Sequence, residues 1–480
     1  MLRMLGRILQ LEGLLLLVPT VVAFIYGESP RPFLLTLVPL LAVGTLLARL
    51  RAKADFFTRE GYVVVGMIWL ALCLTGAMPF WLSGEFASFW DCLFEITSGF
   101  TTSGATILPD IERLPRGILF WRSFSSWVGG MGILLFTLAF LPKVGGRNQI
   151  LVQAEMPGPL ATKLVPKTVQ STQILYIMYI ALTVAEIFVF SIAGMPFFDA
   201  VVSTFACICT GGFAIWNASF AAYNTACQII AIVFMILGSL NFALFFLTLS
   251  GRIRDAMKSD ELRFFLLVAG AASVLVFLNI LPLYRSPAEA LKDAVFQVVS
   301  IQSTSGFSTT DYNLWPAFSR SILVLLMFVG GCSGSTAGSI KCGRLLLMFR
   351  CAKRSILRLS HPRAVKVVKL DGKIVDENTL NTVFAFFICF CILLVAGTVA
   401  VTLDGADLVT AFTTSLGAIT NVGPGLGMVG PMENFSFYSG WTKAFLSFMM
   451  VVGRLEIFPI LLLFQPSIWR HHWPLLSHES

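Results

Sequence analysis

The chain has 480 residues, of which 56% are hydrophobic and only 12% are charged, and this composition excludes a soluble globular protein. Several stretches longer than about 18 residues are almost free of charge, which predicts an all-α polytopic membrane protein. The net charge of +8 does not indicate binding to nucleic acid, because the Lys and Arg residues gather in the connections between apolar stretches. The ten cysteines show no metal-ligand spacing, so we interpret them as packing residues.

Two apolar stretches open the chain. Arg3 and Arg7, followed by the apolar run 11–26, resemble a signal peptide, but no small-residue cleavage site follows. A second apolar run, 33–50, begins almost at once. We therefore expect a retained extension of two transmembrane helices over residues 1–58.

The rest of the chain divides into four repeats, each of which reads as a span, a half-helix, a glycine-bearing loop and a second span. The expected repeat boundaries are 59–168, 169–258, 259–376 and 377–480. The expected first spans are 61–83, 171–195, 262–283 and 379–403, and the expected second spans are 117–141, 223–249, 317–347 and 438–464. With the N-terminal extension this makes about ten spans. Because each repeat crosses the membrane twice, all four have one orientation, which predicts a pseudo-fourfold arrangement around a single pore.

Each half-helix is expected to begin with a helix-capping residue type and to end in a loop with a glycine. The expected N-caps lie thirteen residues before the four glycines and are Asp91, Asp199, Asp293 and Thr410. A half-helix that stops inside the membrane points its carbonyl end, the negative end of its dipole, toward the centre. The glycine lets the backbone turn its carbonyl oxygens toward the axis, where they can replace the water shell of a cation. The residues expected to form this selectivity filter are Thr102, Ser103, Gly104, Thr210, Gly211, Gly212, Thr304, Ser305, Gly306, Asn421, Val422 and Gly423.

The basic residues predict the orientation of the chain. They are concentrated in one set of connections, including segment 341–373, whereas the connections with the glycine loops hold few of them. The positive-inside rule therefore places both termini in the cytoplasm and lets the loops enter from outside. Within 341–373, Asp371-Gly372 predicts a small β-hairpin. We interpret this segment either as a connection attracted to anionic membrane lipid or as a docking surface for a soluble partner, formed by Arg350, Lys353, Arg354 and Arg358.

Two features of the last two repeats predict a gate. Small residues after about Phe328 disfavour a continued helix, so we expect a break with its polar backbone facing a watery pore. These residues are Gly330, Gly331, Ser333, Gly334, Ser335 and Gly338. Arg454 lies in the last span, where a charge costs roughly 2.5–3.5 kcal/mol and would repel a cation in a narrow passage. We expect Arg454 and the loop to form the closed gate, and the alternative is a simple ion pair between Arg454 and Glu456.

Over essentially its whole length, the chain resembles the Trk/Ktr/HKT superfamily of potassium transporters. The segments that carry the resemblance are 101–106, 127–133, 154–159, 209–213, 303–308, 330–341 and 421–425. The two extra N-terminal helices make the chain similar to the bacterial Trk-type potassium uptake membrane subunit (TrkH-like) rather than to the shorter Ktr subunit.

The resemblance implies K⁺ uptake across the bacterial inner membrane by a homodimer with one pore per subunit. It also implies control by a cytosolic nucleotide-binding ring, the Trk A-type subunit. We expect K⁺ in the filter and no nucleotide in this chain, because 330–341 fits neither common phosphate-binding loop. In plant relatives a serine at the first filter glycine accompanies Na⁺ transport, so Gly104 favours K⁺.

Two other functions compete with this expectation. A symporter that couples K⁺ or Na⁺ to protons would need a buried acid such as Glu186, which we otherwise expect to pair between helices. A membrane-embedded enzyme is not expected, because paired carboxylates, a His cluster and a nucleophile–base set at suitable spacing are all missing from the sequence.

Overall fold

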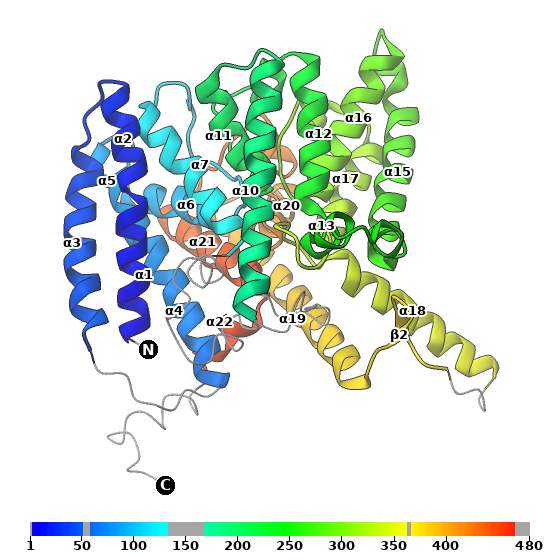
Figure 1. Cartoon of the computed structure of the whole chain (residues 1–480). Coiled ribbons are helices and arrows are strands. Elements are labelled where there is room, and N and C mark those ends of the chain that lie inside the picture. The colour runs from blue at the N-terminus through cyan, green and yellow to red at the C-terminus, as the bar shows by residue number, and fades with distance from the viewer. Residues whose placement is uncertain (1, 51–57, 133–167, 362–365, 466–480) are drawn as a thin grey trace.

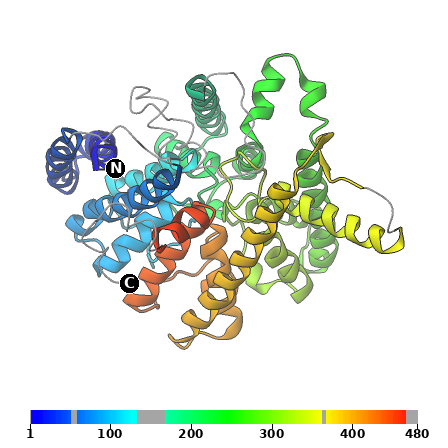
Figure 2. The same cartoon turned by 90° about the horizontal axis from the view of Figure 1, so that it is seen from below.

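The computed structural model describes residues 2–50, 58–132, 168–361 and 366–465. Helices make up most of this part of the chain and are grouped around a shared centre (Figures 1 and 2). The described strands are β1 (Lys369–Leu370) and β2 (Lys373–Ile374), which pair in antiparallel fashion. The turn residues Asp371 and Gly372 have φ angles of 47° and 77°, as a two-residue hairpin requires. The predicted hairpin is confirmed.

The N-terminal extension consists of α1 (Leu2–Leu15), α2 (Leu17–Ile25) and α3 (Arg31–Ala48). Helices α1 and α3 touch through glycines, since a Cβ added to Gly6 would lie 2.7 Å from the carbonyl oxygen of Gly44. The extension lies at the edge of the molecule (Figure 2). Glu12 of α1 accepts a 2.6 Å hydrogen bond from the Thr75 hydroxyl and so joins the extension to the first repeat.

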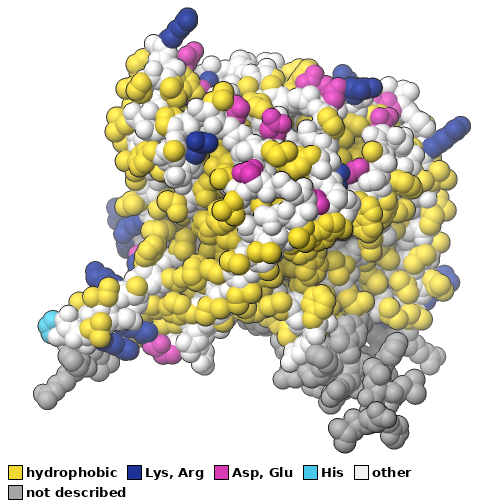
Figure 3. Space-filling model, turned by 180° about the vertical axis from the view of Figure 1, so that it is seen from behind, with side chains coloured by type: hydrophobic (Ala, Val, Ile, Leu, Met, Phe, Trp, Pro, Cys, Tyr) yellow, Lys and Arg dark blue, Asp and Glu magenta, His cyan; other side chains and the backbone are white. Residues whose placement is uncertain are grey.

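The first span of every repeat is a long helix. These spans are α4 (Thr58–Gly76) continued by α5 (Met78–Ser83), α10 (Thr168–Ile192), α15 (Asp260–Ile280) and α19 (Glu377–Thr402). With the two spans of the extension, six described helices are long and apolar enough to cross a membrane. Figure 3 shows the matching surface, where an apolar band lies between faces that carry most of the charged side chains. The expected all-α polytopic membrane fold is confirmed.

The second spans are short or broken. They are α7 (Arg116–Gly130), α12 (Thr225–Ser239) with α13 (Phe242–Leu249), α17 (Ala317–Val329) with α18 (Cys342–Ser360), and α21 (Gly440–Arg454) with α22 (Phe458–Leu463). The chain bends by 95° between α12 and α13. The break after Val329 confirms the predicted end of a helix near Phe328. The continuous spans predicted over 223–249 and 438–464 are wrong.

Contacts with other elements of the protein explain two of these breaks. The Ser239 carbonyl at the end of α12 accepts a 2.9 Å hydrogen bond from the Cys332 amide of repeat three. The exposed backbone left by the break is thereby satisfied within the protein. At the end of α21, a Cβ on Gly453 would lie 2.1 Å from the Ile419 carbonyl oxygen, so the helix packs directly on another backbone. A helical pattern in the sequence carries no signal for either contact.

The four half-helices, hereafter the pore helices, are α6 (Phe89–Phe100), α11 (Phe197–Ile208), α16 (Pro287–Gln302) and α20 (Leu408–Thr420). Their N-cap residues are Ser88, Pro196, Ser286 and Asp407, so the predicted caps Asp91, Asp199, Asp293 and Thr410 are wrong and lie inside the helices. Counted back from the glycine, the N-cap lies sixteen residues earlier in α6, α11 and α20 and twenty residues earlier in α16, so the predicted interval of thirteen was too short. Short turns complete the described elements: η1 (Ser219–Ala222), α14 (Ile253–Ala256), η2 (Leu281–Leu283), η3 (Tyr312–Leu314) and η4 (Gly427–Val429).

Candidate functional site

The four loops that follow the pore helices share one backbone conformation. The first residue of each predicted filter triplet has a positive φ: 56° at Thr102, 53° at Thr210, 62° at Thr304 and 54° at Asn421. The third residue is always a glycine with φ between 68° and 89°, whereas the middle residues are absent from the positive-φ set. Alternating φ signs place successive backbone groups on one side of a chain, which is how backbone dipoles gather around an ion.

The loops also form a closed ring. A Cβ added to Gly104 would meet the Gly211 carbonyl oxygen at 2.7 Å, and one on Gly212 would meet that of Ser305 at 1.9 Å. Continuing around, Gly306 faces the Val422 carbonyl oxygen at 2.2 Å and Gly423 faces that of Ser103 at 2.4 Å. Each glycine therefore lies against the carbonyl that precedes the next glycine. All twelve predicted filter residues belong to this arrangement, which we call the loop ring.

One cavity touches all four loops. It is lined by Gly104, Gly212, Gly306 and Pro424, together with residues from the connections that leave the loops. Three of the four filter glycines therefore face a common space, and the fourth loop reaches it through Pro424. Asp407 caps α20, and the hydrogen bond from the Thr410 hydroxyl holds the pKa of its carboxyl below the ordinary value.

The first side chain of each filter triplet contacts another part of the protein. The Thr304 hydroxyl accepts a 2.9 Å hydrogen bond from the Gly338 amide, and the Thr210 hydroxyl lies 3.3 Å from that of Thr336. The Asn421 amide donates to the Ser103 hydroxyl of the first loop at 2.9 Å. The segment between α17 and α18 is thus hydrogen-bonded directly to the loop ring.

That segment, residues 330–341, is a packed loop and is called the intramembrane loop below. Its Gly338 is in tight contact with the fourth filter loop, because a Cβ there would lie 2.4 Å from the Thr420 carbonyl oxygen. The carboxylate of Glu261 on α15 accepts hydrogen bonds from the Ser333 amide at 2.7 Å and the Gly343 amide at 2.8 Å. Both ends of the intramembrane loop are therefore fastened by one buried side chain.

The predicted gate residues fall on this loop. Gly330 ends α17 with φ of 67°, Gly331 packs on the Ser239 carbonyl oxygen, and Gly334 packs on Asn241. The Ser335 hydroxyl donates to the Cys332 carbonyl at 2.6 Å. The loop is therefore ordered by backbone contacts for which small residues are needed.

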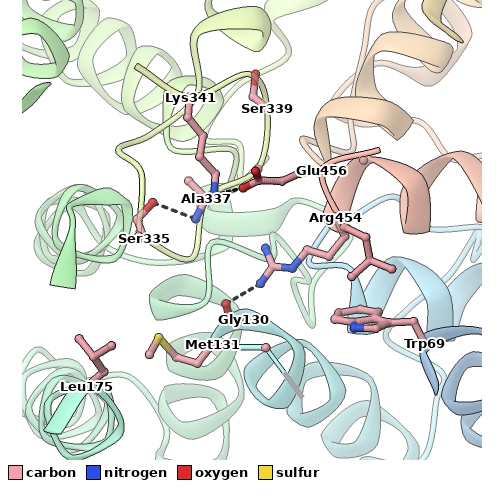
Figure 4. A pocket seen from close by; sticks show the side chains of 15 residues that line it. Trp69, Gly130, Met131, Leu175, Ser335, Ala337, Ser339, Lys341, Arg454 and Glu456 are labelled. Atoms are coloured by element: carbon pink, nitrogen blue, oxygen red, sulfur yellow. Dashed lines mark hydrogen bonds and ion pairs between the residues drawn. The ribbon is translucent and has the colours of Figure 1, made fainter. Parts of the chain in front are cut away.

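Arg454 lies at the end of α21 and joins three elements. Its guanidinium donates to the Thr336 carbonyl of the intramembrane loop at 2.7 Å and to the Gly129 carbonyl of α7 at 2.7 Å. It also donates to the Thr102 hydroxyl of the first filter loop at 3.2 Å. Figure 4 shows the guanidinium between Gly130 and the loop, in a cavity that Ser335, Gly338 and Arg454 help to line.

The ion pairs described for Glu456 are with residues other than Arg454. The Glu456 carboxylate pairs with the Lys341 ammonium at 2.9 Å and with the Arg344 guanidinium (Figure 4 shows the former). Lys341 and Glu456 have φ angles of 74° and 55°, and Ile457 has 71°, a rare value for a β-branched residue. The ion pair thus connects two strained breaks, one at the start of α18 and one between α21 and α22. Sequence reasoning missed this connection and that of Glu261.

The four predicted docking residues on α18 divide into two pairs. Arg350 pairs with Asp260 at 2.8 Å and Arg354 with Glu377 at 2.5 Å, so these two side chains fasten α18 to α15 and α19. Lys353 and Arg358 are exposed. Of the four predicted docking residues, only these two present their charge freely to a partner.

Glu186 of α10 is fully buried beside the Cys207 thiol of the second pore helix. Across the described ranges its carboxyl takes part in no ion pair, so the expected pairing between helices is not found. No group of three metal-ligating side chains occurs in the part of the chain that the structure covers.

Comparisons with known proteins agree with this architecture. The TrkH family model, described as a cation transport protein, matches residues 31–471. The chain is 37% identical to the Trk system potassium uptake protein TrkH of Salmonella typhimurium, with 98% of each chain covered. It is 33% identical to TrkG of Escherichia coli over 97% of this chain and 98% of that protein. The crystal structure of the potassium transporter TrkH from Vibrio parahaemolyticus superimposes with a TM-score of 0.87 at 33% identity, covering 98% and 99% of the two chains.

The match extends over both the N-terminal extension and the four repeats, and the relatives are named as transporters rather than enzymes. The resemblance seen in the sequence is therefore confirmed, and this chain belongs to the TrkH family of cation transport proteins.

Proposed function

We propose that this protein takes up K⁺ through the loop ring. The observation that carries the proposal is the closed circuit in which each filter glycine lies against a carbonyl of the next loop. Such a ring offers oxygens that replace the water shell of a dehydrated cation, with K⁺ as the bound ion. Relatives with 98% coverage are named potassium uptake proteins, which supports K⁺ as the cargo.

The same proposal assigns the gate to Arg454 and the intramembrane loop. The guanidinium holds the Thr336 carbonyl while contacting the first filter loop, so charge and steric block lie directly beside the loop ring. A fixed positive charge in a narrow, low-dielectric passage repels K⁺. Opening then requires the loop to leave Arg454 and α18 to move relative to Glu456.

Regulation is assigned to α18. Its exposed Lys353 and Arg358, with the apolar side chains of Ile356 and Leu359 exposed beside them, form a mixed surface suited to a cytosolic regulatory subunit of the Trk A-type. In this proposal α18 and both termini face the cytoplasmic side of the bacterial inner membrane. The functional unit in this proposal is a homodimer with one pore per subunit, and the nucleotide belongs to the regulator.

A proton-coupled K⁺ or Na⁺ symporter is kept as the second candidate because of Glu186. A buried carboxyl without an ion pair inside a membrane protein is the type of group that proton relays use. Glu186 lies behind the second pore helix and does not line the cavity shared by Gly104, Gly212 and Gly306. This position favours K⁺ uptake that is not coupled to protons.

Ion flux through the purified protein in liposomes tests both candidates, with K⁺, Rb⁺, Na⁺ and pH varied separately. The proposal expects flux that prefers K⁺ and Rb⁺ over Na⁺ and that does not follow an imposed proton gradient. Flux that depends on the proton gradient, and loses this dependence in Glu186→Gln, would support the symporter instead.

A further inference from the structure

A buried ion pair lies directly behind the first filter loop. The Arg122 Nε of α7 is 2.5 Å from the Glu95 Oε1 of pore helix α6, and the two side chains are 1% and 0% exposed. The Glu95 carboxylate also accepts hydrogen bonds from the Thr106 hydroxyl and the Ile107 amide, both at 2.9 Å. Glu95 thus fixes the segment that leaves the first filter loop two residues after Gly104.

Arg122 extends the same network to the second filter loop. Its guanidinium donates to the Ala214 carbonyl at 2.7 Å and lies 3.7 Å from the centre of the Phe213 ring. Phe213 and Ala214 follow Gly212 directly. The ion pair therefore joins the outward segments of two neighbouring loops, and Arg122 helps to line the cavity that the filter glycines share.

Packing alone does not explain this pair. Charges taken out of water cost several kcal/mol each, and apolar side chains of similar volume would often fill such a space at no loss of stability. The equivalent positions nine residues before Gly212, Gly306 and Gly423 hold Ser203, Gln297 and Thr414, so the other pore helices manage without a charge there. The ion pair instead orients the backbone around it, because a planar guanidinium and a carboxylate hold several backbone atoms at fixed angles.

We infer that Glu95 and Arg122 are positioning residues for ion selectivity, which fix the distance between the first and second filter loops. The inference rests on the proposed filter. The spacing of Gly104 and Gly212 determines how closely the carbonyls of these loops can approach a bare cation, and a smaller ion gains when that spacing becomes variable.

The test compares K⁺ and Na⁺ permeability in liposomes for Glu95→Gln and Arg122→Lys. The amide cannot balance the guanidinium, and the ammonium lacks the fork that reaches Glu95 and Ala214 together. We expect the K⁺/Na⁺ permeability ratio to fall about threefold or more in both variants while K⁺ flux persists. Glu12→Gln is the matched control, because it neutralises another buried carboxyl that contacts Thr75 and no filter loop. Its ratio should equal that of the unaltered protein.

Thermal stability of each purified variant separates a selectivity effect from misfolding. If Glu95→Gln and Arg122→Lys do not fold, the permeability ratio of Thr106→Val tests the inference in their place. This variant removes one hydrogen bond to Glu95 and preserves both volume and charges. A folded variant of this set with an unaltered permeability ratio overturns the inference. If the filter glycine variants change ion preference and these variants do not, only this inference fails; if the glycine variants also have no effect, the proposed filter fails.

Discussion

The loop ring predicts that the four filter glycines differ in how badly they tolerate a methyl group. All four have φ between 68° and 89°, so replacement by alanine brings the same left-handed strain of roughly 1–2 kcal/mol. The neighbouring carbonyls add an unequal cost. An ordinary Cβ contact begins at 3.4 Å, so the Gly211 carbonyl must retreat by 0.7 Å (3.4 − 2.7) from Gly104→Ala. The Ser305 carbonyl must retreat by 1.5 Å (3.4 − 1.9) from Gly212→Ala.

Overpacking of this kind costs about 1–3 kcal/mol, and we place the two substitutions at opposite ends of that range. Gly212→Ala should therefore be about 2 kcal/mol less stable than Gly104→Ala, with Gly423→Ala and Gly306→Ala between them. Ion preference should follow the same order, because the atom displaced in each case is a carbonyl of the filter. Gly104→Ala should keep the most K⁺ flux.

The assay combines thermal denaturation of the purified protein with K⁺ and Na⁺ flux in liposomes. Gly84→Ala is the control, because Gly84 has φ of 76° like Gly104 but no atom within 4 Å of an added Cβ. It measures the left-handed strain alone and should leave ion preference unaltered. Equal losses at Gly104 and Gly212, or a milder effect at Gly212, would refute the ring geometry.

Three further predictions concern the gate and its control. Arg454→Ala removes the hold on the Thr336 carbonyl and should raise basal K⁺ flux severalfold without changing K⁺/Na⁺ preference; unaltered flux in folded protein would place the gate elsewhere. Glu456→Gln leaves the buried Lys341 charge without its carboxylate and should raise basal flux and lower stability by about 3 kcal/mol. Liposome flux and thermal denaturation measure the two effects. Normal values for both would argue against a role of the Lys341–Glu456 pair in the gate. The double variant Lys353→Gln/Arg358→Gln should weaken binding of the soluble regulator, measured by titration, and the effect should depend on salt. Arg354→Gln, whose partner is Glu377, should act mainly on stability. Undiminished binding by the double variant would exclude this surface.

Much of the fold was predictable because its signals are local. Uninterrupted apolar runs identify the first spans, and the turn requirement at Asp371-Gly372 identifies the hairpin. The glycine loops after the pore helices were predictable for the same reason, since a recurring apolar run that ends in a glycine loop is visible within some sixteen residues. The clustered small residues after Phe328 likewise predicted the break in the third repeat.

The remaining features depend on contacts between distant segments. The break after Ser239 requires the Cys332 amide, and the partner of Glu456 is Lys341, 115 residues earlier. A pattern within one helix contains no information on either. The starts of the pore helices were misplaced for a different reason. The N-cap lies sixteen residues before the glycine in three pore helices and twenty before it in α16, so an interval of thirteen ends inside each helix.

The order in which the loop ring closes has a consequence for biosynthesis. The first loop meets the fourth through Ser103 and Asn421, which are 318 residues apart, and Arg454 reaches Thr102 across 352 residues. Repeats one to three can enter the membrane and pack on each other during translation, but the first and third repeats each lack one neighbour in the ring until the fourth arrives. The last repeat supplies both the final quarter of the loop ring and Arg454 beside it. Under the proposed function, a nascent chain thus acquires its conduction path and the charge that blocks it in the same step, and an incomplete chain lacks both.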